Sequence, residues 1–107
     1  MEITTEQLKE KIKNGEKLIV DFHGLWCGPC KIMKPTFEKI AEEFRNKKSN
    51  IQLYTMDIDK NREFVASLGI RSIPVIKVFN EGNEVMSKVG LLMEDQIKEI
   101  TKTLIND

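Results

Sequence analysis

The chain contains two cysteines, and both lie in the segment Trp-Cys-Gly-Pro-Cys at residues 26–30. A disulfide between Cys27 and Cys30 would close almost no loop, so it would add little to stability by restricting the unfolded chain. The chain must therefore fold on a hydrophobic core, and its 107 residues are enough for one domain over 1–107. The value of the cysteine pair is then expected to be chemical.

Charge and hydropathy argue against nucleic acid and membrane as partners of this chain. Lys and Arg number 17, as do Asp and Glu, so the formal net charge is zero and we expect no nucleic-acid partner, which would need a basic surface. No apolar run approaches the ~20 residues of a membrane helix, so we expect no membrane contact. Residues 1–6 are acidic and lack the basic and apolar regions of a signal peptide. We expect a cytoplasmic monomer.

Hydrophobic periodicity predicts four helices and four strands. The predicted order is helix, strand, helix, strand, helix, strand, strand, helix. Thr4 and Gln7 fit a helix capping box. Strands are expected at 18–22, 50–58, 75–79 and 85–89, the last two joined by a hairpin at 81–83. Helices are expected from Thr4 to Asn14, after the cysteines, at 61–68 and at 93–105, the last with Met93, Ile97, Ile100 and Leu104 on its apolar face.

This order of elements predicts an α/β fold. A strand–helix–strand unit implies parallel pairing, and a hairpin adds antiparallel strands. We therefore expect a mixed central sheet with helices on both faces.

The cysteine pair falls between the end of a predicted strand and the start of a helix. Cys27 lies at or just before the helix N-terminus, where unpaired N–H groups and the helix dipole favour a thiolate. Cys30 lies about one turn further into the helix and is expected to be more buried. The arrangement predicts that Cys27 attacks a substrate disulfide and that Cys30 then resolves the mixed disulfide.

Two other interpretations of the pair are open. The cysteines could form half of a zinc site, but structural zinc needs four ligands and His23 is the only other soft candidate, so we expect no metal. They could also be unreactive core residues, although Gly28 and Pro29 in a strand-to-helix turn do not favour this.

The sequence resembles the thioredoxin family over essentially its whole length. Trp-Cys-Gly-Pro-Cys at 26–30 is similar, letter for letter, to that family's active-site motif. Asp21-Phe22 resembles the Asp-Phe pair at the end of the strand that precedes this motif in the family. Gly-Ile-Arg-Ser-Ile-Pro at 69–74 resembles the segment with a cis-proline, and Val89-Gly90 resembles part of the substrate groove. The resemblance implies a thioredoxin fold.

The resemblance also implies roles for individual residues. Gly28 and Pro29 belong to the catalytic motif, and Asp21 would be a buried carboxyl that relays a proton to and from Cys30 through water. The alternatives for Asp21 are an exposed edge position or a carboxylate paired with a lysine. The groove that binds substrate would be formed by Trp26, Ile73, Pro74 and Gly90, with a cis Ile73–Pro74 bond offering the backbone of Ile73 to a peptide.

The implied function is a protein disulfide reductase that carries electrons as a dithiol. Gly-Pro between the cysteines resembles the reducing members of the family. The expected partners are disulfide-containing client proteins and a thioredoxin reductase, and no cofactor is expected besides the Cys27–Cys30 disulfide. The alternative is a scaffold subunit of another enzyme, in which the thiols would be dispensable.

Three places depart from the family pattern. His23-Gly24-Leu25 stands where many members have Trp-Ala-x, and Val75 replaces the usual threonine after Pro74. Thr55 stands where many bacterial members place a buried lysine, which predicts that Asp21 lacks a cationic partner.

Overall fold

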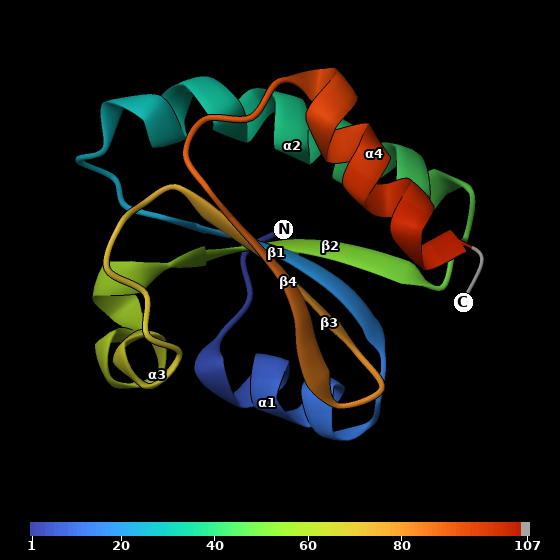
Figure 1. Cartoon of the computed structure of the whole chain (residues 1–107), viewed down its shortest axis with the longest axis horizontal. Coiled ribbons are helices and arrows are strands. Elements are labelled where there is room, and N and C mark those ends of the chain that lie inside the picture. Colours follow the sequence, from blue (N-terminus) through green and yellow to red (C-terminus); the bar gives the residue numbers. More distant parts are fainter. Residues whose placement is uncertain (106–107) are drawn as a thin grey trace.

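The computed structural model describes residues 1–105, and its centre is a four-stranded sheet with helices on both faces (Figure 1). The strands are β1 (Lys17–His23), β2 (Ile51–Asp57), β3 (Val75–Asn80) and β4 (Asn83–Val89). The helices are α1 (Thr5–Lys13), α2 (Gly28–Asn46), α3 (Arg62–Ser67) and α4 (Glu94–Ile105), with a short 3-10 helix η1 (Ile58–Lys60) after β2. Residues 106 and 107 of the predicted domain lie outside the described residues.

The sheet has the strand order β2-β1-β3-β4. β1 pairs in parallel with β2 and antiparallel with β3, and β3 and β4 form the predicted hairpin. The mixed sheet and the α/β class predicted from the sequence are therefore confirmed.

Each face of the sheet carries its own hydrophobic cluster, covered by two helices. The helices α2 and α4 lie on one face and α1 and α3 on the other (Figure 1). Alternate residues of β1 supply both clusters, Ile19 to the α2 side and Val20 to the α1 side, because successive side chains of a strand point to opposite faces. The periodicity of β1 thus fixes which of its side chains face α2.

The helix ends follow local sequence signals. The Thr4 side chain accepts a hydrogen bond from the backbone N–H of Gln7, and the Gln7 side chain accepts one from the backbone N–H of Thr4. This is the predicted capping box at the start of α1.

Each predicted element whose bounds were given differs from the structure by one or two residues at one end or both, and three of these differences have a clear local cause. β2 ends at Asp57, not 58, because the Asp57 side chain accepts a hydrogen bond from the backbone N–H of Asp59 and starts η1. β4 begins at Asn83, two residues before the predicted start at 85. The cause is the turn, which consists only of Glu81 and Gly82 and has positive φ at both residues, as in a type I′ hairpin turn. Met93 precedes α4 and is exposed, so it does not belong to the buried face of that helix.

Candidate active site

The sulfur atoms of Cys27 and Cys30 are bonded to one another at the N-terminus of α2. Cys27 is the N-cap residue, and its Sγ accepts a hydrogen bond of 3.2 Å from the backbone N–H of Cys30. Pro29 fits the first turn because its missing N–H would have no helical partner there. The remaining N–H groups at this helix end would stabilise a negative charge on Cys27 once the disulfide opens.

The two cysteines are almost covered by protein. Cys27 is 5% exposed and Cys30 is 2% exposed, so Cys30 is the more buried, as its position in the helix predicts. Gly28 is open to solvent, and a Cβ at that position would meet no atom within 4 Å. Space alone therefore does not require glycine between the cysteines, and the role of Gly28 stays a prediction.

Two loops distant in sequence meet beside Cys27. The carbonyl oxygen of Ile73 lies 4.0 Å from Cys27 Sγ, and the Ile73–Pro74 peptide bond is cis. The backbone N–H of Gly90 donates a 2.8 Å hydrogen bond to the carbonyl of Pro74. Gly90 has a φ of +105°, which side chains with a Cβ rarely adopt. The structure thus places Ile73, Pro74 and Gly90 together on one side of the disulfide.

Trp26 lies on the surface next to Cys27 in the sequence. Its side chain is 66% exposed, and its Nε1–H donates a 2.8 Å hydrogen bond to Asp59 Oδ2 in η1. Sequence reasoning missed Asp59, although an aspartate in a turn just after a strand was a usable signal. The hydrogen bond holds the indole in one orientation beside the disulfide.

Gly24 provides the space that this orientation of Trp26 needs. A Cβ at Gly24 would lie 2.9 Å from Trp26 Cε2 and 3.1 Å from Ile73 Cδ1. We expect Gly24→Ala to push the indole away from Asp59 and to lower the free energy of unfolding by about 1–3 kcal/mol. Because Trp26 is the only tryptophan in the sequence, its fluorescence emission reports the displacement directly.

Gly28→Ala is the matched control, since its Cβ would enter open space. It should leave the emission of Trp26 unchanged. An emission spectrum of Gly24→Ala identical to that of the wild type would show that the indole does not need this space.

Asp21 is fully buried in the central strand. It lies opposite Thr55 on β2 and Ile76 on β3, and it is on the α2 side of β1, as is Ile19 two residues earlier. Neither of its carboxyl oxygens has a hydrogen-bond partner among residues 1–105. An exposed edge position for Asp21 is therefore wrong.

Burial raises the pKa of the Asp21 carboxyl from 3.8 to about 7. The main cause is desolvation, which disfavours the charged form. Lys34 on α2 acts in the opposite direction and lowers this pKa, while the charges of Glu2 and Glu38 raise it further. A carboxyl with this pKa can both accept and release a proton near neutral pH.

The neighbourhood of Asp21 contains a polar network that sequence reasoning missed. His23 Nε2 lies 3.0 Å from Glu2 Oε1, and the hydroxyl of Thr55 donates a 2.8 Å hydrogen bond to the same oxygen. Glu2 Oε2 accepts a hydrogen bond from the backbone N–H of Asp57. Glu2 belongs to the segment before α1, which meets β2 through an isolated bridge to Thr55. Local sequence patterns gave no signal for this bridge.

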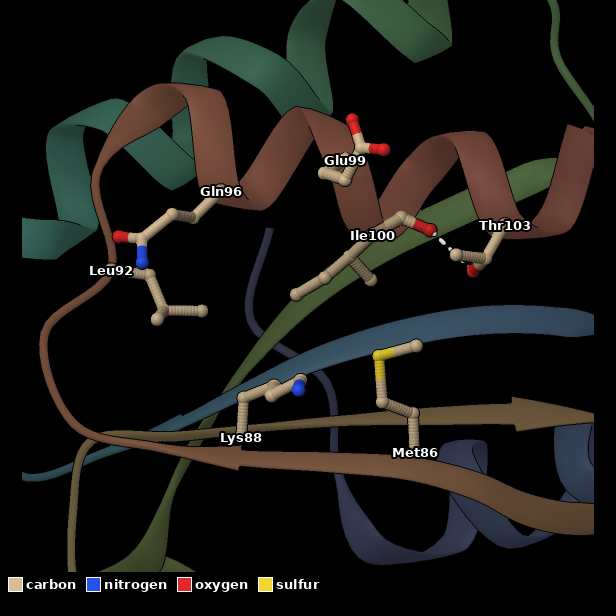
Figure 2. Close-up of a pocket in the computed structure, with 7 residues that line it drawn as sticks. All are labelled: Met86, Lys88, Leu92, Gln96, Glu99, Ile100 and Thr103. Atoms are coloured by element: carbon tan, nitrogen blue, oxygen red, sulfur yellow. Dashed lines mark hydrogen bonds between the residues drawn. The ribbon is translucent and has the colours of Figure 1, made fainter.

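A pocket of about 330 Å³ lies away from the disulfide, between β4 and α4 (Figure 2). In Figure 2 Met86 of β4 and Ile100 of α4 face one another across it. None of the predicted site residues lines this pocket. This pocket is therefore separate from the residues around Cys27.

The part of the chain that the structure describes contains neither a cluster of metal ligands nor a helix that could span a membrane. Within residues 1–105, no three or more His, Cys, Asp or Glu side chains are grouped so that they could hold a metal ion. In the same part of the chain, no helix combines the length and the apolar character needed to cross a bilayer.

Comparison with known proteins gives consistent matches. The thioredoxin family model matches residues 1–103. A thioredoxin of Mycoplasmoides gallisepticum is 32% identical, covering 90% of this chain and 92% of its own, and one of Buchnera aphidicola is 33% identical, covering 99% and 96%. Among solved structures, a chloroplastic thioredoxin z has 30% identity and a TM-score of 0.83, covering 99% of this chain and 94% of its own.

Proposed function

The chain belongs to the thioredoxin family and is a protein-disulfide oxidoreductase, and we propose that Cys27 and Cys30 carry its two half-reactions. The observation that carries this proposal is the bonded pair at the N-terminus of α2, with Cys27 as the N-cap residue. Proteins of this family act on the disulfides of client proteins and are themselves reduced by a reductase.

In the reduced protein, the Cys27 thiolate attacks one sulfur of a client disulfide. A mixed disulfide forms, and the first client sulfur leaves as a thiolate. Cys30 then gives its proton to Asp21 and attacks Cys27 Sγ. The Cys27–Cys30 disulfide forms, the second client sulfur leaves, and the client thiolates take up protons. Two electrons pass from the dithiol to the client, and the reductase returns two.

The Asp21 carboxyl is the proton acceptor in this scheme. Its position on the α2 side of β1 directs it toward the helix that carries Cys30, and its pKa of about 7 suits proton exchange with a thiol near neutral pH. We propose that one water bridges the two groups. The internal disulfide is the only redox group that this scheme uses, so no cofactor is required.

Client proteins are proposed to bind on the surface around Cys27. Exposed apolar side chains flank the cysteines and Gly90 in the sequence, and we propose that they form an apolar rim of the kind that is typical of protein interaction sites. Its exposed members are Leu25, Trp26, Ile32, Val89 and Leu91. Ile73, Pro74 and Gly90 would offer backbone atoms to an extended client segment.

A monomer in the cytoplasm fits this role best. The rim must be open for clients, which favours a chain that does not cover it with a second copy. A disulfide reductant also needs a reducing compartment to stay in its dithiol form.

We expect Cys30→Ser to trap a client protein as a mixed disulfide through Cys27, because the resolving thiol is missing. Incubation of the reduced variant with a disulfide-containing protein, followed by mass spectrometry under non-reducing conditions, measures the adduct. Cys27→Ser is the control and should form far less adduct. Comparable trapping through Cys30 in that control would contradict the assigned roles.

A further inference from the structure

Polar side chains gather where β1 and β2 end, on the face covered by α2. In the parallel register, Asp21 lies opposite Thr55 and His23 lies opposite Asp57. Residues two apart in a strand share a face, so these four belong to one side of the sheet. All four are buried, whereas Ile19, Ile51 and Leu53 of the same two strands belong to the hydrophobic cluster on that face.

The Glu2 side chain is fixed among these residues by three contacts. Its Oε1 accepts from the Thr55 hydroxyl at 2.8 Å and lies 3.0 Å from His23 Nε2, and its Oε2 accepts from the backbone N–H of Asp57. A carboxylate oxygen can only accept, so His23 donates through Nε2. The His23 ring is almost completely buried, and it therefore holds Glu2 from inside the protein.

The position of Thr55 sets how close the Glu2 charge comes to Asp21. Neighbouring strands are about 4.8 Å apart, and Thr55 lies directly opposite Asp21 while its hydroxyl binds Glu2. One side chain thus separates the two carboxyl groups. Because Asp21 is fully buried, the interaction is screened less than it would be in water, while the Glu2 side chain, which is 41% exposed, is screened in part by solvent.

We propose that Glu2, held by His23 and Thr55, is a positioning residue of the redox reaction that keeps a negative charge beside Asp21 and so favours the protonated Asp21 carboxyl. The inference rests on the proposed role of Asp21 as the proton acceptor for Cys30. It assigns a function to Glu2 and His23, which Thr55 links to the position opposite Asp21.

The other charged groups near Asp21 are held differently. Lys34 and Glu38 project from α2, and Glu38 lies 3.0 Å from the Met1 amino group, which offsets its charge. The Asp57 side chain is engaged by the backbone N–H of Asp59. On β3, Asp21 faces the uncharged Ile76. Three carboxyl groups therefore lie near Asp21, those of Glu2, Glu38 and Asp57. Of these, Glu2 makes the most hydrogen bonds to buried residues.

The chemical consequence concerns the strength of Asp21 as a base. The negative charge on Glu2 makes Asp21 hold its proton up to a higher pH, which brings its proton affinity closer to that of the Cys30 thiol. Without that charge, Asp21 loses its proton at lower pH and takes the Cys30 proton less readily.

Glu2→Gln tests this, since glutamine keeps the shape of the side chain and one acceptor oxygen for Thr55 and His23. It removes the charge, together with the acceptor for the backbone N–H of Asp57. The titration midpoint of Asp21, followed by ¹³C NMR of its carboxyl in the oxidised protein, should fall by about half a pH unit. The acid limb of the turnover–pH profile should move in the same direction. Glu10→Gln is the matched control, because Glu10 is an exposed glutamate of α1, on the other face of the sheet.

A second pair of variants tests the part played by His23. His23→Leu removes the donor and should lower the Asp21 midpoint as Glu2→Gln does, whereas His23→Gln keeps an N–H donor and should restore it. A purely structural role would lower thermal stability in both without moving the midpoint. That pattern would overturn the inference, as would equal midpoints in Glu2→Gln and Glu10→Gln.

Failure of the proposed function has a separate signature. If the turnover–pH profile of Asp21→Asn keeps the acid limb of the wild-type profile, Asp21 is not the proton acceptor. The inference about Glu2 is then wrong as well. If Asp21→Asn removes the limb but Glu2→Gln does not shift it, only the role of Glu2 is wrong.

Discussion

Replacement of both Cys27 and Cys30 by serine is expected to reduce disulfide turnover to the uncatalysed rate. The Cys27–Cys30 pair is the electron store of the proposed cycle, and serine hydroxyls cannot form a mixed disulfide. The reduction of insulin by a small dithiol, with and without the protein, measures the effect. Far-UV circular dichroism should show an unchanged fold, since the bridge closes too short a loop to support it.

The double variant also separates catalysis from a scaffold role. A scaffold subunit would keep its binding partner and lose nothing when the thiols are removed. Equal turnover by the wild type and the double variant would contradict the reductase assignment of the cysteines.

Asp21→Asn is expected to raise the free energy of unfolding at neutral pH by roughly 2–4 kcal/mol. Burial raises the pKa of Asp21 from 3.8 to about 7, so between these values the folded protein holds a proton that the unfolded chain has released. The penalty of the charged group grows as the pH rises through this window and is constant above it. The gain in Asp21→Asn should therefore be full above pH 7 and vanish towards pH 4. Denaturant unfolding across pH 4–8 measures it.

The same substitution should slow turnover by about 10²-fold, because Cys30 loses its proposed proton acceptor. Stability and activity thus change in opposite directions, which a simple packing defect would not produce. A variant that is less stable at neutral pH and fully active would show that Asp21 neither pays a desolvation penalty nor moves a proton.

Much of the fold followed from short-range patterns. The short apolar run of β1 and the helical spacing in α2 placed the strand, the turn and the helix around Cys27, and these signals lie within a few residues of one another. The same local reading placed Asp21 inside an apolar strand, and the structure confirms that it is buried. The resemblance to a family added Ile73, Pro74 and Gly90, which no local pattern would have joined to the cysteines.

Contacts between distant segments were beyond sequence reasoning. The Glu2–His23 pair depends on how the N-terminal segment meets β2, and the hydrogen bond from Trp26 to Asp59 depends on the path of η1. Lys34 was missed as a charge near Asp21 because it lies on a different element. Met93 was assigned to a buried face because helical spacing cannot tell the first residue of a helix from the last residue before it.

The central position of β1 has a consequence for how the protein forms during synthesis. β1 needs β3 on one side, yet β3 is made long after both cysteines, α2 and β2. Pairing between strands so distant in sequence is slow, and a growing chain that ends before β3 leaves one side of β1 without partners. Such a chain already carries its thiols but lacks the Ile73 carbonyl and the Gly90 loop that border Cys27 in the finished protein. On the ribosome, the thiols therefore exist before the surface that we propose to bind their clients.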